Sequence, residues 1–331
     1  MRIAIGIKAL NEAAKIEAAL RSALAAVAPY GGTVLLADSG SSDATVEIAR
    51  KLPVEVVQLA NRAERSCGAG AQLAFQHLDA DYFCLIDGDM ALVPGFIDAS
   101  LAFLDAHPEV AGVGGQVIER NLEAEEFQIR AAAMAREAHR RAGPVDRLDG
   151  GGVYRMRAIR EVGYFSDRNL HSFEEFDLAA RLTSRGWTLV RIDVPAVEHR
   201  GHSGNGYRLL LYRLTSGQMG GAGEVLRASF GKPHFGLVVR RLGHLRKAVV
   251  IAAWWLALVL ALWCAPVIAA ALVVVPVAWL GWRRGSLALG LYSFAMWNAL
   301  AIGLIGGLFR RRVPPTRPLA SVAFTRLPPA A

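Results

Sequence analysis

Hydrophobic and polar positions alternate in blocks along the first ninety residues of the chain. Short apolar runs rich in Ile, Val and Leu are separated by longer segments whose apolar residues recur at helical spacing. The strand-like runs are RIAIGI, TVLLAD, VEVVQL and DYFCLID, and the helical segments are NEAAKIEAALRSALAAV, DATVEIARKL and residues 70–78. This order predicts an α/β fold with a mostly parallel, Rossmann-like sheet that is covered by helices on both faces.

The last third of the chain has a different pattern. No charged residue lies between Lys247 and Arg283, and a second uncharged run extends from Gly285 to Phe309. Each run is longer than the roughly 20 residues that cross a bilayer core. Pro266 predicts a tight helical hairpin within the first run, so we expect three membrane segments. The third is expected to be re-entrant, because a full third span would place the arginines at 310–312 outside, against the positive-inside tendency. A two-span arrangement with a long, bent first segment is the alternative.

The net charge of +8 is concentrated next to these apolar runs. From Asn205 to Lys247 the only acidic residue is Glu224, whereas eight residues are Lys or Arg. Because this stretch leads directly into an apolar run, it predicts binding to anionic membrane lipids rather than to nucleic acid. The predicted domains are a catalytic domain at 1–204, a basic juxtamembrane segment at 205–247, membrane helices at 248–309 and a Pro- and Arg-containing tail at 310–331.

Cysteine use and the N-terminus indicate the compartment. The three cysteines, Cys67, Cys84 and Cys264, have no metal-ligand spacing and predict no disulfide framework. The N-terminus MRIAIGIKALNE reads as a strand that leads into a helix, and it lacks the features of a signal peptide. We therefore expect a multi-pass protein of the cytoplasmic (inner) membrane with its catalytic domain in the cytoplasm.

Polar residues collect where the predicted parallel strands end, at residues 8–12, 38–43 and 87–89. Ligands of such sheets bind at the carboxyl ends of the strands. Asp38 is predicted to contact a base or ribose, whereas Asp43 is expected to cap a helix. Asp87 and Asp89 flank Gly88, and both carboxylates could face one hard cation. A D-x-D pattern alone is weak evidence, because ordinary turns also produce it.

The ordered series of these motifs resembles one known family. N-E follows the first strand, D-S-G-S-S-D the second and D-G-D a buried strand, and EEFDLAARL and VEHRG come later. From about Arg2 to Gly201 this series resembles glycosyltransferase family 2, the inverting sugar transferases with the GT-A fold. The added membrane helices make the layout similar to the succinoglycan-type exopolysaccharide transferases.

The resemblance implies roles for residues at the strand ends. Asn11, Glu12 and Asp38 would line the nucleoside pocket, with Gly68 also placed in the nucleotide-sugar site. Asp87 would lie by the ribose and the diphosphate.

The resemblance also implies a metal site for Mg or Mn. Asp89 would bind the ion, with Asp87 as a second candidate ligand. His199 of VEHRG matches a position that supplies a further ligand in many relatives. An interior histidine bonded to the backbone is the alternative for His199.

The acceptor side of the implied site depends on FEEFDLAARL. The family usually reads E-D-x-D-L here, and its second acid is the general base, which corresponds to Glu175. Glu174 is the reserve candidate. Asp177 is a third candidate, although an ion pair with Arg181, four residues later on the same helix, also accounts for it.

Three departures from the family pattern affect the interpretation. The usual P-x-Y-N-E is KALNE here, so that Lys8 either approaches a donor phosphate or is solvated. Ala69 replaces a lysine that is common in the family. No Q-x-x-R-W follows the base region, which favours transfer of a single sugar over processive synthesis. The segment HSGNGY could fold over the donor as a lid or be a plain connector.

The sequence thus predicts an inverting glycosyltransferase of the hexosyltransferase type. It would move one sugar from a nucleoside diphosphate sugar, with a UDP-sugar as first choice, to a lipid-linked or glycan acceptor in exopolysaccharide biosynthesis. A sugar nucleotidyltransferase would need a Gly-rich basic loop near the N-terminus, which IGIKALNE does not supply. A non-catalytic scaffold that binds sugar nucleotide in a membrane assembly complex is the alternative from another class.

Overall fold

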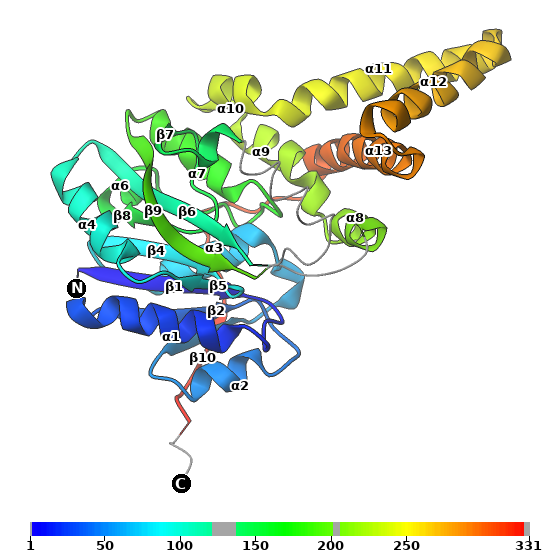
Figure 1. Ribbon diagram of the computed structural model, residues 1–331. Helices are drawn as coiled ribbons and strands as arrows, with labels where there is room; N and C mark the ends of the chain where they lie inside the picture. The colour runs from blue at the N-terminus through cyan, green and yellow to red at the C-terminus, as the bar shows by residue number, and fades with distance from the viewer. Residues whose placement is uncertain (1, 121–136, 201–205, 328–331) are drawn as a thin grey trace. The chain divides into compact units, whose positions relative to one another are not determined.

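The chain divides into two compact units. The computed structural model describes residues 2–120, 137–200 and 206–327 (Figure 1). Unit 1 comprises the described residues up to Leu170, those from Glu174 to Arg200, and those from Val313 onward. Unit 2 comprises His171–Phe173 and the described residues from Gly206 to Arg312. The C-terminal tail therefore belongs to the same unit as the N-terminal half of the chain.

Four parallel strands form the centre of the sheet in unit 1. They are β1 (Ile3–Ala9), β2 (Thr33–Asp38), β3 (Glu55–Leu59) and β4 (Tyr82–Asp87), in the order β3-β2-β1-β4. Ala9 of β1 lies opposite Asp38 of β2, and Lys8 lies opposite Asp87 of β4. This register brings the predicted polar strand ends together at one edge of the sheet.

The remaining strands make the sheet mixed rather than mostly parallel. They are β5 (Met90–Leu92), β6 (Val110–Glu119), β7 (Gly143–Val145), β8 (Gly152–Arg155), β9 (Thr188–His199) and β10 (Ser321–Phe324). β8 pairs antiparallel with both β4 and β6, and β9 pairs parallel with β6 but antiparallel with β5 and β7. The α/β fold class is confirmed, whereas the parallel pattern holds only for the first four strands and for β6 with β9.

Helices cover both faces of this sheet (Figure 1). One face carries α1 (Ile16–Val27), α2 (Thr45–Arg50) and α4 (Phe96–Ala106), and the other carries α3 (Cys67–Gln76), α6 (Met156–Glu161) and α7 (Glu174–Thr183). Ile3, Ile5 and Ile7 of β1 point into the first core because side chains alternate along a strand. A Cβ at Gly6 would lie 2.7 Å from the Cβ of Ala74, so glycine lets α3 approach β1 closely.

Some predicted segments end or lie elsewhere than expected. The helix predicted over residues 70–78 is α3, which begins earlier because the Ser66 hydroxyl caps it by accepting the Ala69 N–H at 2.8 Å. The sequence from Glu123 to about Arg141 also predicts a charged helix; most of it lies outside the described residues, and residues 138–140 form a 3-10 turn. Most of the HSGNGY segment also lies outside the described residues.

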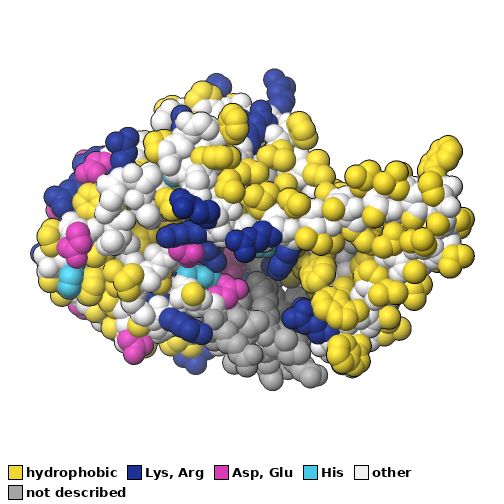
Figure 2. All heavy atoms as spheres, turned by 90° about the horizontal axis from the view of Figure 1, so that it is seen from above, with side chains coloured by type: hydrophobic (Ala, Val, Ile, Leu, Met, Phe, Trp, Pro, Cys, Tyr) yellow, Lys and Arg dark blue, Asp and Glu magenta, His cyan; other side chains and the backbone are white. Residues whose placement is uncertain are grey.

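Unit 2 is helical. Its short elements are α8 (Gly206–Thr215), the 3-10 turn η4 (Gln218–Gly220), α9 (Gly221–Ser229) and α10 (Phe235–Arg241). Its long helices are α11 (Gly243–Cys264), α12 (Pro266–Arg284) and α13 (Leu287–Phe309), all three long and apolar enough to cross a membrane. Figure 2 shows hydrophobic side chains over most of the visible surface of these long helices, at its right. The hairpin predicted at Pro266 is present, since α11 ends at Cys264 and α12 begins at Pro266.

The tail adds a strand to the edge of the sheet in unit 1. β10 pairs antiparallel with β3, with Ser321 opposite Leu59 and Phe324 opposite Val56. The Arg168 guanidinium donates to the carbonyls of Arg317 and Pro318, at 2.8 and 3.0 Å. Because β10 covers the backbone groups of β3, an otherwise open edge of the sheet is paired.

Candidate functional site

A lysine and three carboxylates meet at the carboxyl end of β1. The Nζ of Lys8 lies 2.8 Å from Oε1 of Glu174 and 3.3 Å from Oδ1 of Asp87. The Lys8 side chain is only 14% exposed, so the ion pairs are largely shielded from solvent. Glu174 and Glu175 form the first turn of α7. Lys8 therefore bonds to two acids of the predicted site, a role that the sequence did not reveal although Lys8 and Asp87 share a register position.

The two neighbouring glutamates differ in their surroundings. Glu174 is buried and forms the ion pair with Lys8, whereas Glu175 is half-buried. Burial and the charge of Glu174 raise the pKa of Glu175 to about 8, although Lys8 acts in the opposite direction. Burial lowers the pKa of Lys8, but the charges of Asp87, Glu174 and Glu175 outweigh it and keep Lys8 protonated. A carboxyl group with a raised pKa next to a fixed charge is suited to accept a proton near neutral pH.

Asp89 lies with His199 rather than with Asp87. The Nε2 of His199 is 3.3 Å from Oδ2 of Asp89, and its Nδ1 is 2.6 Å from Oε2 of Glu119. Burial lowers the pKa of His199, but hydrogen bonds with Asp89 and Glu119 outweigh this effect and raise it to about 9. Glu119 holds the histidine ring from behind, as carboxylates commonly do for metal-binding histidines. Sequence reasoning missed Glu119, because only strand pairing brings it to His199.

Strand pairing explains why Asp89 and His199 meet. β5 begins directly after Asp89 and pairs antiparallel with the end of β9, which places Met90 opposite His199. The N–H of Arg200 donates to the carbonyl of Asp89 at 3.0 Å. A Cβ at Gly88 would lie 2.9 Å from the Cβ of Ala9, so glycine is required between the two aspartates for the chain to pass β1. The D-G-D segment therefore directs its two carboxylates to different partners.

The residues present fit a divalent cation that is shared with a substrate. Among residues 2–120, 137–200 and 206–327, no three His, Cys, Asp or Glu side chains form a metal-binding group. The separation of 3.3 Å between Asp89 Oδ2 and His199 Nε2 nevertheless suits two ligands of one ion, which lie about 3 Å apart when each bond is about 2.1 Å long. Mg²⁺ commonly takes one or two protein ligands and completes its shell with phosphate oxygens and water.

The residues predicted to bind the nucleoside lie in two loops that are joined by hydrogen bonds. Both oxygens of the fully buried Asp38 accept hydrogen bonds within its own loop, and Oδ1 also accepts one from Gln58 at 2.7 Å. Asn11 has φ of 58°, and its Oδ1 accepts the N–H of Ser42 at 2.8 Å. Asp43 bonds to Ala13 and Thr45 and so joins the two loops. These bonds give Asp38 and Asn11 a structural role, and their contact with a nucleotide stays a prediction.

Glu12 and Gly68 are also placed by the structure. Oε2 of Glu12 lies 3.2 Å from Nζ of Lys15, which is also 4.0 Å from Oδ2 of Asp89. Lys15 is thus a basic residue beside the candidate metal ligands that sequence reasoning did not single out. The N–H of Gly68 donates to the carbonyl of Leu170 at 2.8 Å, and a Cβ there would lie 2.0 Å from the carbonyl oxygen of Asp167. Gly68 is therefore required for packing, and its role in nucleotide binding stays a prediction.

The third acid of α7 has a different environment. Asp177 is fully buried, and its Oδ2 accepts a hydrogen bond from Nε of Arg181 at 2.8 Å. Arg181 also donates to the carbonyls of Tyr164 and Phe165. This geometry favours the ion-pair alternative for Asp177 over a catalytic role.

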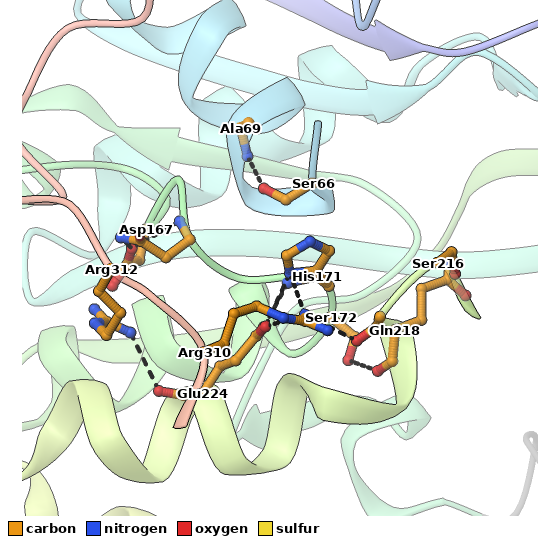
Figure 3. A network of polar contacts seen from close by, with 12 residues as sticks. Ser66, Ala69, Asp167, His171, Ser172, Ser216, Gln218, Glu224, Arg310 and Arg312 are labelled. Carbon is orange, nitrogen blue, oxygen red and sulfur yellow. Dashed lines mark hydrogen bonds and ion pairs between the residues drawn. The ribbon is translucent and has the colours of Figure 1, made fainter. Parts of the chain in front are cut away.

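A second polar cluster lies within unit 2 (Figure 3). Glu224 of α9 is buried, and its carboxylate accepts the backbone N–H of His171 at 2.8 Å and pairs with Arg310. The Ser172 hydroxyl donates to the carbonyl of Gln218 at 2.7 Å. The only acid of the basic segment is therefore used inside unit 2. It fixes the short segment His171–Phe173, which is followed in the chain by Glu174.

Comparisons with known proteins agree with this architecture. The model of glycosyl transferase family 2 matches residues 4–163. A mannosyltransferase from Pyrobaculum calidifontis, solved in complex with GDP-Man and Mn²⁺, has a TM-score of 0.64 and 18% identity over 93% of this chain and 87% of that chain. Residues 1–349 of S. aureus TarS, in complex with UDP-GlcNAc, give 0.50 and 15% over 74% and 76%. Against a longer TarS chain the values are again 0.50 and 15%, but only 44% of that chain is spanned. No curated protein sequence matches significantly.

The mixed sheet and its structural neighbours define the GT-A fold of glycosyltransferases. The sequence match then specifies the family more closely. Residues 4–163, which begin in β1 and end after α6, match glycosyl transferase family 2. The resemblance inferred from the ordered motifs is thereby confirmed.

Proposed function

We propose that the chain transfers one sugar from a nucleoside diphosphate sugar to a lipid-linked or polysaccharide-precursor acceptor at the cytoplasmic face of the membrane. The observation that carries this proposal is the grouping of Lys8, Glu174, Glu175 and Asp87 at one strand end, with Asp89 and His199 adjacent to it in the chain and the sheet. One cluster is suited to move a proton, and the other to hold a cation on a diphosphate.

The residues of the two clusters would have different roles in an inverting sugar transfer. Glu175 would accept the proton of the acceptor hydroxyl, and Lys8 would keep the charge of Glu174 paired while it does so. Asp89 and His199 would hold a Mg²⁺ or Mn²⁺ ion, with Glu119 orienting the histidine. When bound, such an ion neutralises the negative charge of a departing nucleoside diphosphate. Attack from the face opposite the leaving group would invert the anomeric centre.

The composition of unit 2 supports a membrane acceptor. Each of its three long helices is long and apolar enough to cross a membrane. Basic side chains are exposed at Arg240 and Arg241, just before α11, and at Arg246 and Lys247, near its start. Cations at this position are suited to anionic headgroups or to a diphosphate-linked lipid.

The test is turnover by the purified full chain in lipid vesicles. The assay supplies Mn²⁺, a bacterial lipid extract and a panel of both UDP- and GDP-sugars, since similar folds were solved with each nucleotide. We expect release of nucleoside diphosphate with one donor, dependent on the extract, and abolished by a chelator. Donor binding without turnover under any combination would favour the non-catalytic scaffold instead.

The raised pKa of Glu175 predicts a pH dependence for this reaction. A general base works when deprotonated, so the transfer rate should rise with pH through the pKa of about 8. Glu174→Gln removes a neighbouring negative charge that raises this pKa, so the profile should shift to lower pH. Lys8→Met removes a charge that lowers it, so the profile should shift to higher pH. The check is kcat against pH for folded variants.

The exposed Glu47 of α2 supplies the control for this measurement. Glu47→Gln should leave the pH profile unchanged. Shifts of the Glu174 and Lys8 variants in the same direction would contradict the assignment of the base.

A further inference from the structure

The C-terminal tail fixes the side of the membrane to which the chain returns. Residues 313–327 are built into unit 1 through the pairing of β10 with β3 and through the bonds of Arg168 to the tail carbonyls. The N–H of Leu327 also donates to the carbonyl of Arg50 at 2.9 Å. Because unit 1 is one folded body, its residues before and after unit 2 in the sequence lie on the same side of a bilayer.

The chain must therefore cross the bilayer an even number of times between Arg200 and Val313. Only the residues at 310–312 separate the end of α13 from Val313. Three extended residues span about 10 Å, whereas the hydrocarbon core is about 30 Å thick. The C-terminal end of α13 consequently lies at the face where unit 1 lies. Since a continuous helix crosses either once or not at all, three crossings are excluded.

The charges select which two helices cross. Arg246 and Lys247 stand at the start of α11, Arg283 and Arg284 at the end of α12, and three arginines follow α13. The turn from Cys264 to Pro266 between α11 and α12 carries no charge. Crossing by α11 and α12 leaves every one of these cations on one face, as the positive-inside rule favours. Either other pair would place Arg283 and Arg284 on the far side.

The contacts of the three helices agree with this choice. The indole N–H of Trp254 in α11 donates to the carbonyl of Leu272 in α12 at 2.9 Å, as expected of an antiparallel hairpin. Of the most apolar 18-residue stretch of each helix, 11% is buried in α11 and in α12, whereas 33% is buried in α13. α13 is thus the helix that protein covers most.

One face of α13 is packed on the short elements of unit 2. Added Cβ atoms at Gly303 and Gly307 would lie 2.4 Å from the carbonyl oxygen of Met219 and 2.0 Å from that of Gly220. The glycine pair at 303 and 307 therefore lets α13 approach η4 and α9. Arg310, just beyond the helix, pairs with the buried Glu224 of α9 (Figure 3). A charged pair at this end suits the membrane surface rather than the hydrocarbon core.

The opposite face of α13 is apolar and exposed. Ile302, Ile305 and Phe309 are 53%, 42% and 80% exposed, and they follow one another at helical spacing. A helix that is covered by protein on one side and apolar on the other can lie in the boundary between headgroups and acyl chains without a polar face of its own.

We infer that α11 and α12 form a hairpin that crosses the bilayer twice, whereas α13 lies along the membrane surface on the side of unit 1 with Ile302, Ile305 and Phe309 against lipid. The inference rests on the membrane placement in the proposed function but not on catalysis. Of the described residues, only the turn around Cys264 then faces the far side. The Lys and Arg side chains at the ends of α11, α12 and α13 then all lie at the membrane face on the side of unit 1.

Thiol labelling with a membrane-impermeant maleimide, in sealed vesicles of each orientation, tests the arrangement. Cys264 is exposed and serves as the native probe of the turn in a Cys67→Ser variant, since Cys84 is buried. In a second background with both Cys67→Ser and Cys264→Ser, single variants Glu47→Cys, Ser286→Cys and Arg311→Cys report on unit 1 and on the two ends of α13. Labelling does not depend on turnover, so its outcome is separate from that of the sugar-transfer assay.

We expect Glu47→Cys, Ser286→Cys and Arg311→Cys to react in the same vesicle orientation, and Cys264 to react in the opposite one. Reaction of Arg311→Cys together with Cys264 would show that α13 crosses and would overturn the inference. Reaction of Cys264 together with Glu47→Cys, or only after detergent has opened the vesicles, would show that the hairpin does not reach the far side and would overturn it as well.

Discussion

Glu175→Gln is expected to slow sugar transfer by about a hundred- to ten-thousand-fold, the usual contribution of a positioned general base. Glutamine keeps the length and shape of the side chain but cannot take the acceptor proton. Within residues 2–120, 137–200 and 206–327, the half-buried Glu175 makes no ion pair comparable to that of Glu174 with Lys8 at 2.8 Å, so this variant should fold normally. The measurement is kcat with saturating donor and acceptor, alongside donor affinity by calorimetry.

Donor affinity separates a lost base from a damaged site. Glu175→Gln should bind the donor as the unchanged protein does, because the candidate nucleotide and metal residues lie on other elements. Glu174→Gln should retain measurable transfer with a shifted pH profile. If Glu174→Gln loses as much activity as Glu175→Gln, or if Glu175→Gln turns over at the normal rate, the base is not Glu175.

The central part of the fold was predictable because the local spacing of apolar residues determines its strands and helices. The apolar runs that form β1 to β4 alternate with helical patterns, and β1, β2 and β4 end at the polar residues that the sequence marks. Their parallel register then brings Lys8, Asp38 and Asp87 to one edge. These are consequences of strand order in a parallel sheet, which the pattern of alternating elements favours.

The missed features all depend on pairing between distant segments. Glu119 reaches His199 only because β6 and β9 pair in a register that no local pattern records. The short strands β5 and β8 join the sheet antiparallel, which made the sheet mixed. The tail segment VPPTRP predicts an extended chain, yet nothing in the composition of the tail indicates that it pairs with β3. Long-range contacts of this kind decided both the candidate metal site and the return of the chain to unit 1.

The D-G-D segment illustrates both sides of this comparison. Its position after a buried strand marked it as a candidate site, and the glycine proves necessary because β1 passes close by. The sequence allowed both carboxylates to face one ion, whereas the structure turns Asp87 to Lys8 and Asp89 to His199. Strand ends from two different parts of the sheet supply these partners, so the division of roles could not be seen from spacing alone.

Asp89→Asn is expected to reduce turnover by at least about a hundredfold and to abolish the gain in nucleotide affinity that Mn²⁺ confers. The amide keeps the size of the carboxylate, but it removes the negative charge that a hard cation requires. Binding of the nucleoside diphosphate, measured with Mn²⁺ and after chelation, should become the same in the two conditions. In the unchanged protein we expect the chelator to weaken binding strongly.

Substitutions of two neighbouring acids provide an intermediate variant and a control for the Asp89→Asn prediction. Glu119→Gln leaves His199 in place but loosens its orientation, so metal affinity should fall by about 10- to 100-fold without being lost. Glu198 adjoins His199 in β9, yet its partner is Arg120, so Glu198→Gln should match the unchanged protein. If Asp89→Asn kept its Mn²⁺-dependent affinity while Glu198→Gln lost it, the cation would have to lie on the other side of β9. The roles given to Asp89 and His199 would then be wrong, because the shared 3.3 Å contact between them is what assigns the ion to that edge of the sheet.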